Sequence, residues 1–135
     1  MNRLLGFSLL ELLIVMAIIT ILLTVSYPLY LSHLVKARRN QAAINLVYIA
    51  SQLENFYSLY DSYQGATLEA LGVSAFTDDH SYMMSLQSLG DNTYLIAAIP
   101  QGHQAESDLQ CQSLLINEKG EKMISGAGNS FNCWS

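Results

Sequence analysis

Among residues that could do chemistry, Glu11 has the most unusual setting. It is the only charged residue between Arg3 and Lys36, and it lies near the start of an apolar run. A carboxylate in hydrocarbon costs roughly 3 kcal/mol unless it has a charged partner or reaches water. Glu11 is therefore either a carboxylate at a membrane interface or the acidic half of an ion pair.

Three histidines and one acidic cluster are the other candidates. His33, His80 and His103 accompany no recognisable nucleophile motif, and the chain has no glycine-rich phosphate loop and no Cys-x-x-Cys pair. Asp78, Asp79 and His80 are adjacent, but neighbours without a distant partner are a poor metal ligand set, which favours a solvated turn. These patterns predict no enzyme, no cofactor and no metal.

The apolar run around Glu11 is long enough to cross a membrane. Residues 12–27 are almost entirely Leu, Ile, Val, Met and Ala, and they leave no polar face. About 20 residues at about 1.5 Å of helical rise match a hydrocarbon layer of about 30 Å. A secretory signal would be shorter and would end at a small-residue cleavage site. Residues 7–27 therefore predict one transmembrane helix.

The charges that follow this run are unevenly distributed. Lys36, Arg38 and Arg39 cluster directly after it, whereas residues 40–135 carry ten acidic residues against two lysines. Because phosphate contacts need Lys and Arg, direct binding of nucleic acid is not expected. The basic cluster could contact lipid headgroups, but a solvated helix face is favoured.

Residues 28–135 predict one small head of the α+β class. Helical sequence continues to about Tyr60, and Pro28 is expected to kink it because proline removes a donor and crowds the preceding turn. Apolar residues at intervals of three and four predict that the second half of the helix packs on a core. This stripe comprises Ala42, Leu46, Ile49, Leu53, Phe56 and Tyr60.

An antiparallel sheet is expected to cover that stripe. Residues 61–80 predict an irregular connection, with a short helix around residues 68–71. Turn-forming segments at residues 90–92 and 117–120 separate the strand-like runs, which predict a meander of three or four strands. The runs occupy residues 82–86, 93–99, 112–116 and, more weakly, 121–125.

The only two cysteines, Cys111 and Cys133, lie in the C-terminal part of the chain. In a chain that crosses a membrane an even number of cysteines favours a disulfide, whereas a cytosolic chain would keep two buried thiols. The bond would hold residues 126–132, whose sequence predicts no helix or strand.

Residues 6–12, Gly-Phe-Ser-Leu-Leu-Glu-Leu, resemble the cleavage and methylation motif of type IV prepilins. That family joins a short leader, a Gly-Phe junction and a glutamate at fixed offset to a long apolar helix, often with a proline where this chain has Pro28. The resemblance implies that residues 1–6 are a leader, that prepilin peptidase/N-methyltransferase cuts between Gly6 and Phe7, and that it methylates the new amine of Phe7. It further implies that Glu11 pairs with the Phe7 amine of a neighbouring subunit.

The resemblance extends more loosely over the whole chain. The Tyr-rich helix end, the Ile99-Pro100 strand end and the terminal Cys-Trp are similar to PilE-type minor pilins. This implies a structural subunit of a type IV pilus that takes part in assembly or initiation, with major and minor pilins and the inner-membrane assembly machinery as partners. The alternatives are a pseudopilin of a type II secretion system and a membrane-tethered module that binds a ligand or DNA.

Topology is the point on which charge and resemblance disagree. The positive-inside rule would place Lys36, Arg38 and Arg39 in the cytoplasm. The prepilin resemblance implies the reverse: a single-pass protein of the bacterial inner membrane with a periplasmic head, which later joins a cell-surface pilus. The more specific motif decides for the second arrangement. Whether that pilus serves motility, adhesion or DNA uptake stays open.

Overall fold

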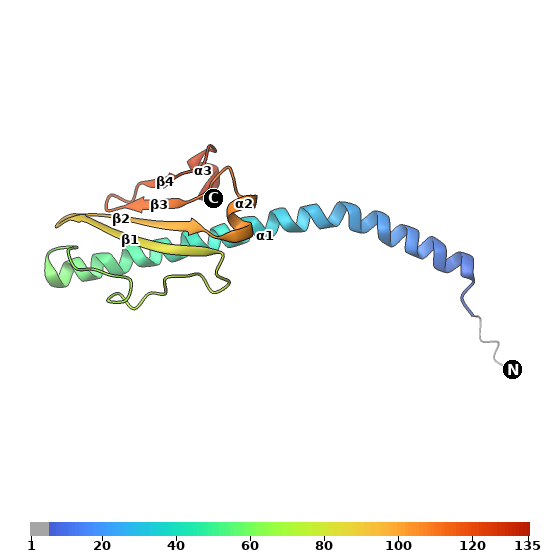
Figure 1. Cartoon of the computed structure of the whole chain (residues 1–135), viewed down its shortest axis with the longest axis horizontal. Coiled ribbons are helices and arrows are strands. Elements are labelled where there is room, and N and C mark those ends of the chain that lie inside the picture. The colour runs from blue at the N-terminus through green and yellow to red at the C-terminus, as the bar shows by residue number, and fades with distance from the viewer. Residues whose placement is uncertain (1–5) are drawn as a thin grey trace. The chain divides into compact units, whose positions relative to one another are not determined.

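The computed structural model describes residues 6–135 and divides into two compact units, one ending at Leu34 and the other comprising Val35–Ser135 (Figure 1). A single 52-residue helix, α1 (Leu9–Tyr60), contributes to both units. We call the second unit the head. Its boundary falls seven residues after the one expected at Tyr27 and Pro28. Of the expected leader, only Gly6 belongs to the described residues.

The first unit is helical from Leu9 onward, and its side chains are uncovered. Residues 6–30 are all exposed, although most of them are apolar. The hydroxyls of Thr20 and Thr24 donate to the carbonyl oxygens of Met16 and Ile21, both at 2.7 Å. Because these hydroxyls are satisfied inside the helix, they are compatible with apolar surroundings. Pro28 lies within α1 without ending it, and a kink there stays a prediction.

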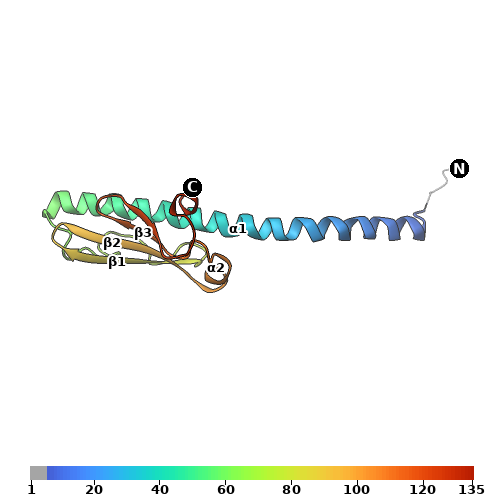
Figure 2. The same ribbon diagram turned by 90° about the horizontal axis from the view of Figure 1, so that it is seen from above.

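The head contains a four-stranded antiparallel sheet in the order β1-β2-β3-β4 (Figure 1), and Figure 2 shows β1, β2 and β3 from above. Its strands are β1 (Tyr82–Gly90), β2 (Thr93–Pro100), β3 (Leu114–Asn117) and β4 (Lys122–Ile124). Each strand pairs only with its sequence neighbour, which is the meander that the sequence predicts. A tight turn at residues 91–92 joins β1 to β2.

The core lies between one face of this sheet and the part of α1 that belongs to the head. Strand β2 alternates between buried and half-buried positions, so that one face is directed inward and the other outward. The first four residues of the predicted stripe, Ala42, Leu46, Ile49 and Leu53, are completely buried against it. This part of the prediction is confirmed.

The end of the stripe differs from expectation. Phe56 is half-buried and Tyr60 is 66% exposed, because the chain leaves the helix directly after Tyr60. Tyr63, just beyond the helix, is buried in the core at this end of the head instead. Its ring centroid lies 4.7 Å from that of Tyr57 and 4.9 Å from that of Tyr94. Burial raises the pKa of the Tyr63 hydroxyl, and its hydrogen bond to Glu54 acts in the same direction.

Two short helices were not expected from the sequence. They are α2 (Gly102–Ser107) and α3 (Ser130–Cys133), and the predicted helix around residues 68–71 is a series of turns. Helices of one or two turns are too short to show periodicity and depend on contacts made elsewhere in the fold. For α3 the local signal is Asn129, whose side chain accepts a hydrogen bond from the Phe131 amide at 2.8 Å.

The C-terminal segment is closed by a disulfide between Cys111 and Cys133, the pair expected from the sequence. Backbone hydrogen bonds from Gly126 to Cys111 and from Gly128 to Gln110 hold the segment against the chain near Cys111. A Cβ atom at Gly126 would collide with the carbonyl group of Gln110. Close approach of two backbones therefore requires glycine at this point.

Candidate functional site

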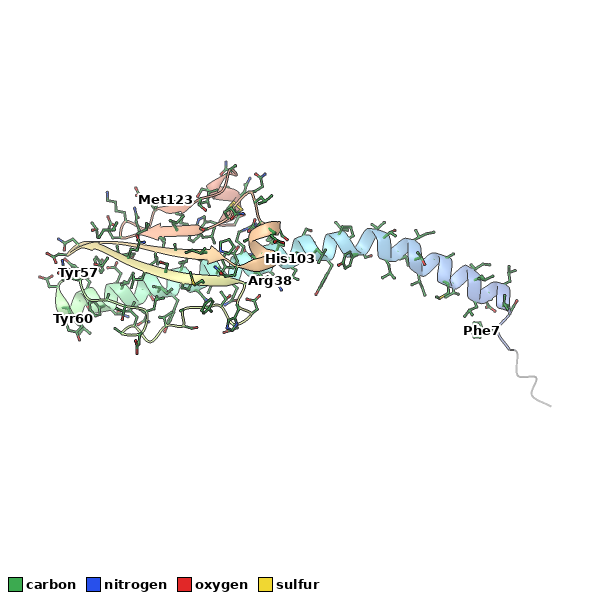
Figure 3. All side chains as sticks on the ribbon, in the orientation of Figure 1. Phe7, Arg38, Tyr57, Tyr60, His103 and Met123 are labelled. Atoms are coloured by element: carbon green, nitrogen blue, oxygen red, sulfur yellow. A yellow bond between two sulfur atoms is a disulfide. The ribbon has the colours of Figure 1, made fainter. Side chains whose placement is uncertain are left out.

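The prepilin-like motif straddles the start of α1. Gly6, Phe7 and Ser8 precede the helix, and the Phe7 side chain is 82% exposed (Figure 3). A peptide bond outside regular structure can enter a peptidase cleft without unwinding a helix. Glu11 lies in the first turn of α1 and is exposed. The partial positive charge of a helix N-terminus favours a carboxylate at that position.

The helix that follows is suited to an apolar environment. By length and composition α1, which begins near the N-terminus, could cross a membrane. Combined with the motif, this indicates membrane anchoring of the chain. The described residues belong to a single chain, so the pairing of Glu11 with a neighbour's Phe7 stays a prediction.

The head contains a buried ion pair that the sequence did not predict. Arg39 Nη1 lies 2.8 Å from Asp108 Oδ1, and the two side chains are only 11% and 4% exposed. Arg39 therefore does not belong to a solvated helix face as expected. The correction has a simple cause: Asp108 is 69 residues away in sequence and is brought to α1 by the end of α2. No local pattern could have identified it.

The ion pair continues into a buried hydrogen-bond network. The Tyr82 hydroxyl donates to Asp108 Oδ2 at 3.2 Å, and Gln104 Nε2 donates both to the Tyr82 hydroxyl and to the carbonyl oxygen of Val35, each at 3.1 Å. The pKa of Tyr82 is raised to about 12, mainly by burial; the Asp108 carboxylate acts in the same direction and the hydrogen bond from Gln104 in the opposite one. The network thus fastens α2 and β1 to the first turns of α1 within the head.

A second ion pair lies at the surface. Arg38 Nε is 3.0 Å from Asp79 Oδ2, with side chains 30% and 43% exposed. Burial alone would raise the pKa of Asp79, but hydrogen bonds from Ser81 and Thr77 and the charge of Arg38 outweigh it and lower that pKa. Asp79 is therefore part of a defined turn that binds α1, in addition to being solvated. Among residues 6–135 no group of three His, Cys, Asp or Glu side chains could hold a metal.

The three histidines lie in different settings, and two of them share a pocket. His80 and His103 both line an open pocket of about 290 Å³ beside Arg38, and Figure 3 shows His103 and Arg38 together at that end of the head. His80 stacks on Phe76, and His103 shares a 3.0 Å hydrogen bond with Ser107. His33 is an exposed residue of the first unit.

Two family models match the chain. The model described as "Type IV minor pilin ComP, DNA uptake sequence receptor" matches residues 28–115, and the model described as "Prokaryotic N-terminal methylation motif" matches residues 1–27. A search among curated protein sequences found no match.

Solved pilin structures have a similar fold. A type IV pilin from Shewanella oneidensis is 25% identical, with a TM-score of 0.57 over 75% of this chain and 98% of that one. The non-core minor pilin PilV of Neisseria meningitidis is 17% identical, with a TM-score of 0.58 over 73% of this chain and 94% of that one. The expected α+β architecture is confirmed. Since the first family model covers well over half of the sequence, this chain belongs to the type IV minor pilin ComP family and is a type IV pilus minor pilin.

Proposed function

We propose that this minor pilin is cut between Gly6 and Phe7, is methylated at the Phe7 amine, and enters type IV pili through the apolar part of α1 to take part in their assembly or initiation. The supporting observation is the order of features along the chain. An exposed Gly6-Phe7 bond outside regular structure precedes an uncovered apolar helix whose first turn contains Glu11.

The same order suggests how the chain is oriented. We place the leader in the cytoplasm and the head in the periplasm, with residues 7–27 in the inner membrane until assembly. The Cys111–Cys133 disulfide supports this arrangement, because such bonds form and persist in oxidising compartments. Prepilin peptidase/N-methyltransferase, the inner-membrane assembly machinery and other pilins are the expected partners.

Glu11 has a physical role in this proposal. Cleavage would create a cationic amine at Phe7, at nearly the same depth as the Glu11 carboxylate. In a staggered bundle of helices, Glu11 of one subunit can pair with the Phe7 amine of another, and only one axial register satisfies both charges. Packing of the apolar side chains does not distinguish one axial register from another, so the ion pair selects the register.

The test is the ratio of protein in sheared pili to protein in the inner membrane for Glu11→Val and for Glu11→Asp. The valine variant should insert and fold normally, because the apolar segment is long enough without Glu11, but should be depleted from pili. The aspartate variant keeps the charge and should retain part of the incorporation. A wild-type ratio for the valine variant would mean that Glu11 is a tolerated interfacial carboxylate.

Mass spectrometry of the same sheared filaments tests the processing site and the remaining alternative. The mature chain should begin with N-methyl-Phe7. Intact Met1, or a new terminus beyond Tyr27, would contradict the proposal. Recovery of the chain only in a type II secretion pseudopilus would favour the pseudopilin alternative.

Direct binding of DNA is not part of this proposal, although the description of the matching family names a DNA uptake sequence receptor. Ten acidic residues of the head oppose five basic ones. Of the five, Arg39 is buried in an ion pair and Arg38 is paired with Asp79. Few cations remain for phosphate contacts. Saturable, salt-dependent binding of duplex DNA by the purified full-length chain would contradict this expectation.

A further inference from the structure

The last turns of α1 form one wall of a second open pocket, which has a volume of about 260 Å³. Most of its lining residues recur at three- and four-residue intervals and therefore lie on one face of the helix. They are Gln52, Asn55, Phe56, Leu59 and Tyr60, with Leu71 of the connection opposite. Figure 3 shows Tyr60 at the end of this helix.

The wall formed by α1 contains two aromatic rings, one of which is well exposed. The rings of Phe56 and Tyr60 have centroids 4.5 Å apart and are tilted by 39°, and the Tyr60 side chain is 66% exposed. Two other tyrosines of this region have polar partners: Tyr57 donates to Asn92 at 2.8 Å and Tyr63 to Glu54 at 2.9 Å. Because its side chain is exposed, the Tyr60 ring is available as a stacking surface.

The same wall contains two amide side chains and the Tyr60 hydroxyl. In the part of the chain that the structure describes, the side chains of Gln52, Asn55 and Tyr60 make no hydrogen bond with other protein groups; the nearest bond, from Ser58, goes to the Asn55 main-chain carbonyl. Each amide provides two donors and an acceptor, and the hydroxyl can act as either. The pocket thus offers neutral groups of both kinds around an apolar surface.

Charge limits what this pocket can hold. None of its lining residues is charged, and three exposed carboxylates, Glu54, Asp61 and Glu69, adjoin lining residues in the sequence. The paired Arg38 and Arg39 lie at the other end of the head's helix, about 30 Å away by helical rise. Anionic ligands, including phosphates, would be repelled here.

We propose that this pocket binds a neutral saccharide. A sugar ring presents C–H groups that can stack on Tyr60 and hydroxyls that both donate and accept hydrogen bonds, as the amides of Gln52 and Asn55 do. A metal cation would favour carboxylate ligands, and the lining contains none. An apolar peptide segment would bury those amides without partners, which is costly. This binding activity is separate from assembly and does not depend on it.

The test uses the full-length protein in a detergent without a sugar headgroup. Saturation-transfer NMR is recorded with maltose, lactose and N,N′-diacetylchitobiose as probes. At least one probe should bind saturably, with saturation transferred from the protein to the C–H protons of the sugar. Tyr60→Ala should then weaken binding about tenfold, whereas Tyr60→Phe, which keeps the ring, should weaken it about threefold. Tyr48→Ala removes another exposed tyrosine of α1 outside the pocket and should leave affinity unchanged.

Several results would overturn this proposal. One is the absence of saturable binding for all three probes, and another is an equal loss for Tyr48→Ala and Tyr60→Ala. Tighter binding of sialyllactose or choline than of the neutral sugars would assign the pocket to a charged ligand. If Tyr60→Ala depletes the chain from pili and no saccharide binds, the pocket contacts another pilin. Failure of the Glu11 experiment, in contrast, would leave the saccharide result untouched.

Discussion

The two units of this minor pilin contain parts of the same helix in opposite situations. Up to Tyr30 the apolar side chains of α1 are exposed, and Leu22, for example, is 61% exposed. After Val35 the helix becomes amphipathic, and Leu46 is completely buried beneath the sheet. Both parts are rich in leucine and isoleucine. They differ in whether other residues of the same chain bury their apolar side chains.

This difference means that substitutions in the two units should affect different properties: the folding of the head, and the insertion or assembly of the first unit. The head buries its apolar stripe by folding, so substitutions in the stripe should alter its free energy of unfolding. The first unit can bury its side chains only in a membrane or against other subunits, so substitutions there should alter insertion or assembly instead. Polar groups follow the same division: Thr20 is satisfied within its own helix, whereas Arg39 needs a partner from a distant segment.

The largest effect on the head is expected from Asp108→Ala. This change leaves Arg39 buried without its counter-charge and removes the acceptor of the Tyr82 hydroxyl, which should lower the free energy of unfolding by about 3–5 kcal/mol. Denaturant titration of the full-length protein, followed by Trp134 fluorescence, measures it. Arg38→Ala is the matched control, because it breaks the exposed ion pair and leaves the hydrogen bonds of Asp79 in place, and it should cost at most about 1 kcal/mol. Equal losses would mean that burial of the pair is unimportant.

Substitution of a core leucine compares the two units directly. Leu46→Ala should destabilise the head by about 2–5 kcal/mol, because it removes buried methyl groups and leaves a cavity. Leu22→Ala makes the same chemical change in the first unit and should leave head unfolding unchanged. A comparable loss for Leu22→Ala would show that the first unit contributes to the folding of the head.

Removal of the disulfide should have a somewhat smaller effect. Replacing Cys111 and Cys133 by alanine opens a loop with a sequence separation of 22 and should cost about 3 kcal/mol on the chain-entropy model. Reduction of the wild-type protein should give a similar shift in the unfolding midpoint. Thiol titration of the unfolded, non-reduced chain should find no free thiol, and two thiols per chain would contradict the bond.

The smallest effect concerns the pH dependence of the exposed pair. The pKa of Asp79 is lowered in the folded head, so its contribution is fully present above the unfolded value of about 3.9 and is lost as pH falls through the folded value. Wild-type stability should therefore exceed that of Asp79→Asn at pH 6, by less than about 1 kcal/mol, and the two should converge in acid. Paired unfolding curves at pH 6 and pH 3 check this. A difference that grew in acid would reverse the assigned direction.

Local composition and periodicity determined much of this protein from the sequence alone. Three features follow from residues that are close together in the sequence: the apolar run, the stripe from Ala42 to Leu53 and the order of the strands. The cysteine pairing follows from their number, because two cysteines can form only one bond within the chain. Helix and strand patterns repeat every few residues, so they remain visible without knowledge of the fold. The prepilin-like motif is likewise contained in seven consecutive residues.

Tertiary structure alone decided which distant groups meet. Arg39 and Asp108 are 69 residues apart, and Gln104 reaches the carbonyl oxygen of Val35 across the same separation. Nothing near Arg39 distinguishes it from a solvated arginine. Likewise, only the point at which the chain leaves α1 determines that Tyr63 is buried and Tyr60 is exposed. Ion pairs and aromatic contacts act over a few ångströms in space, and the fold sets those distances.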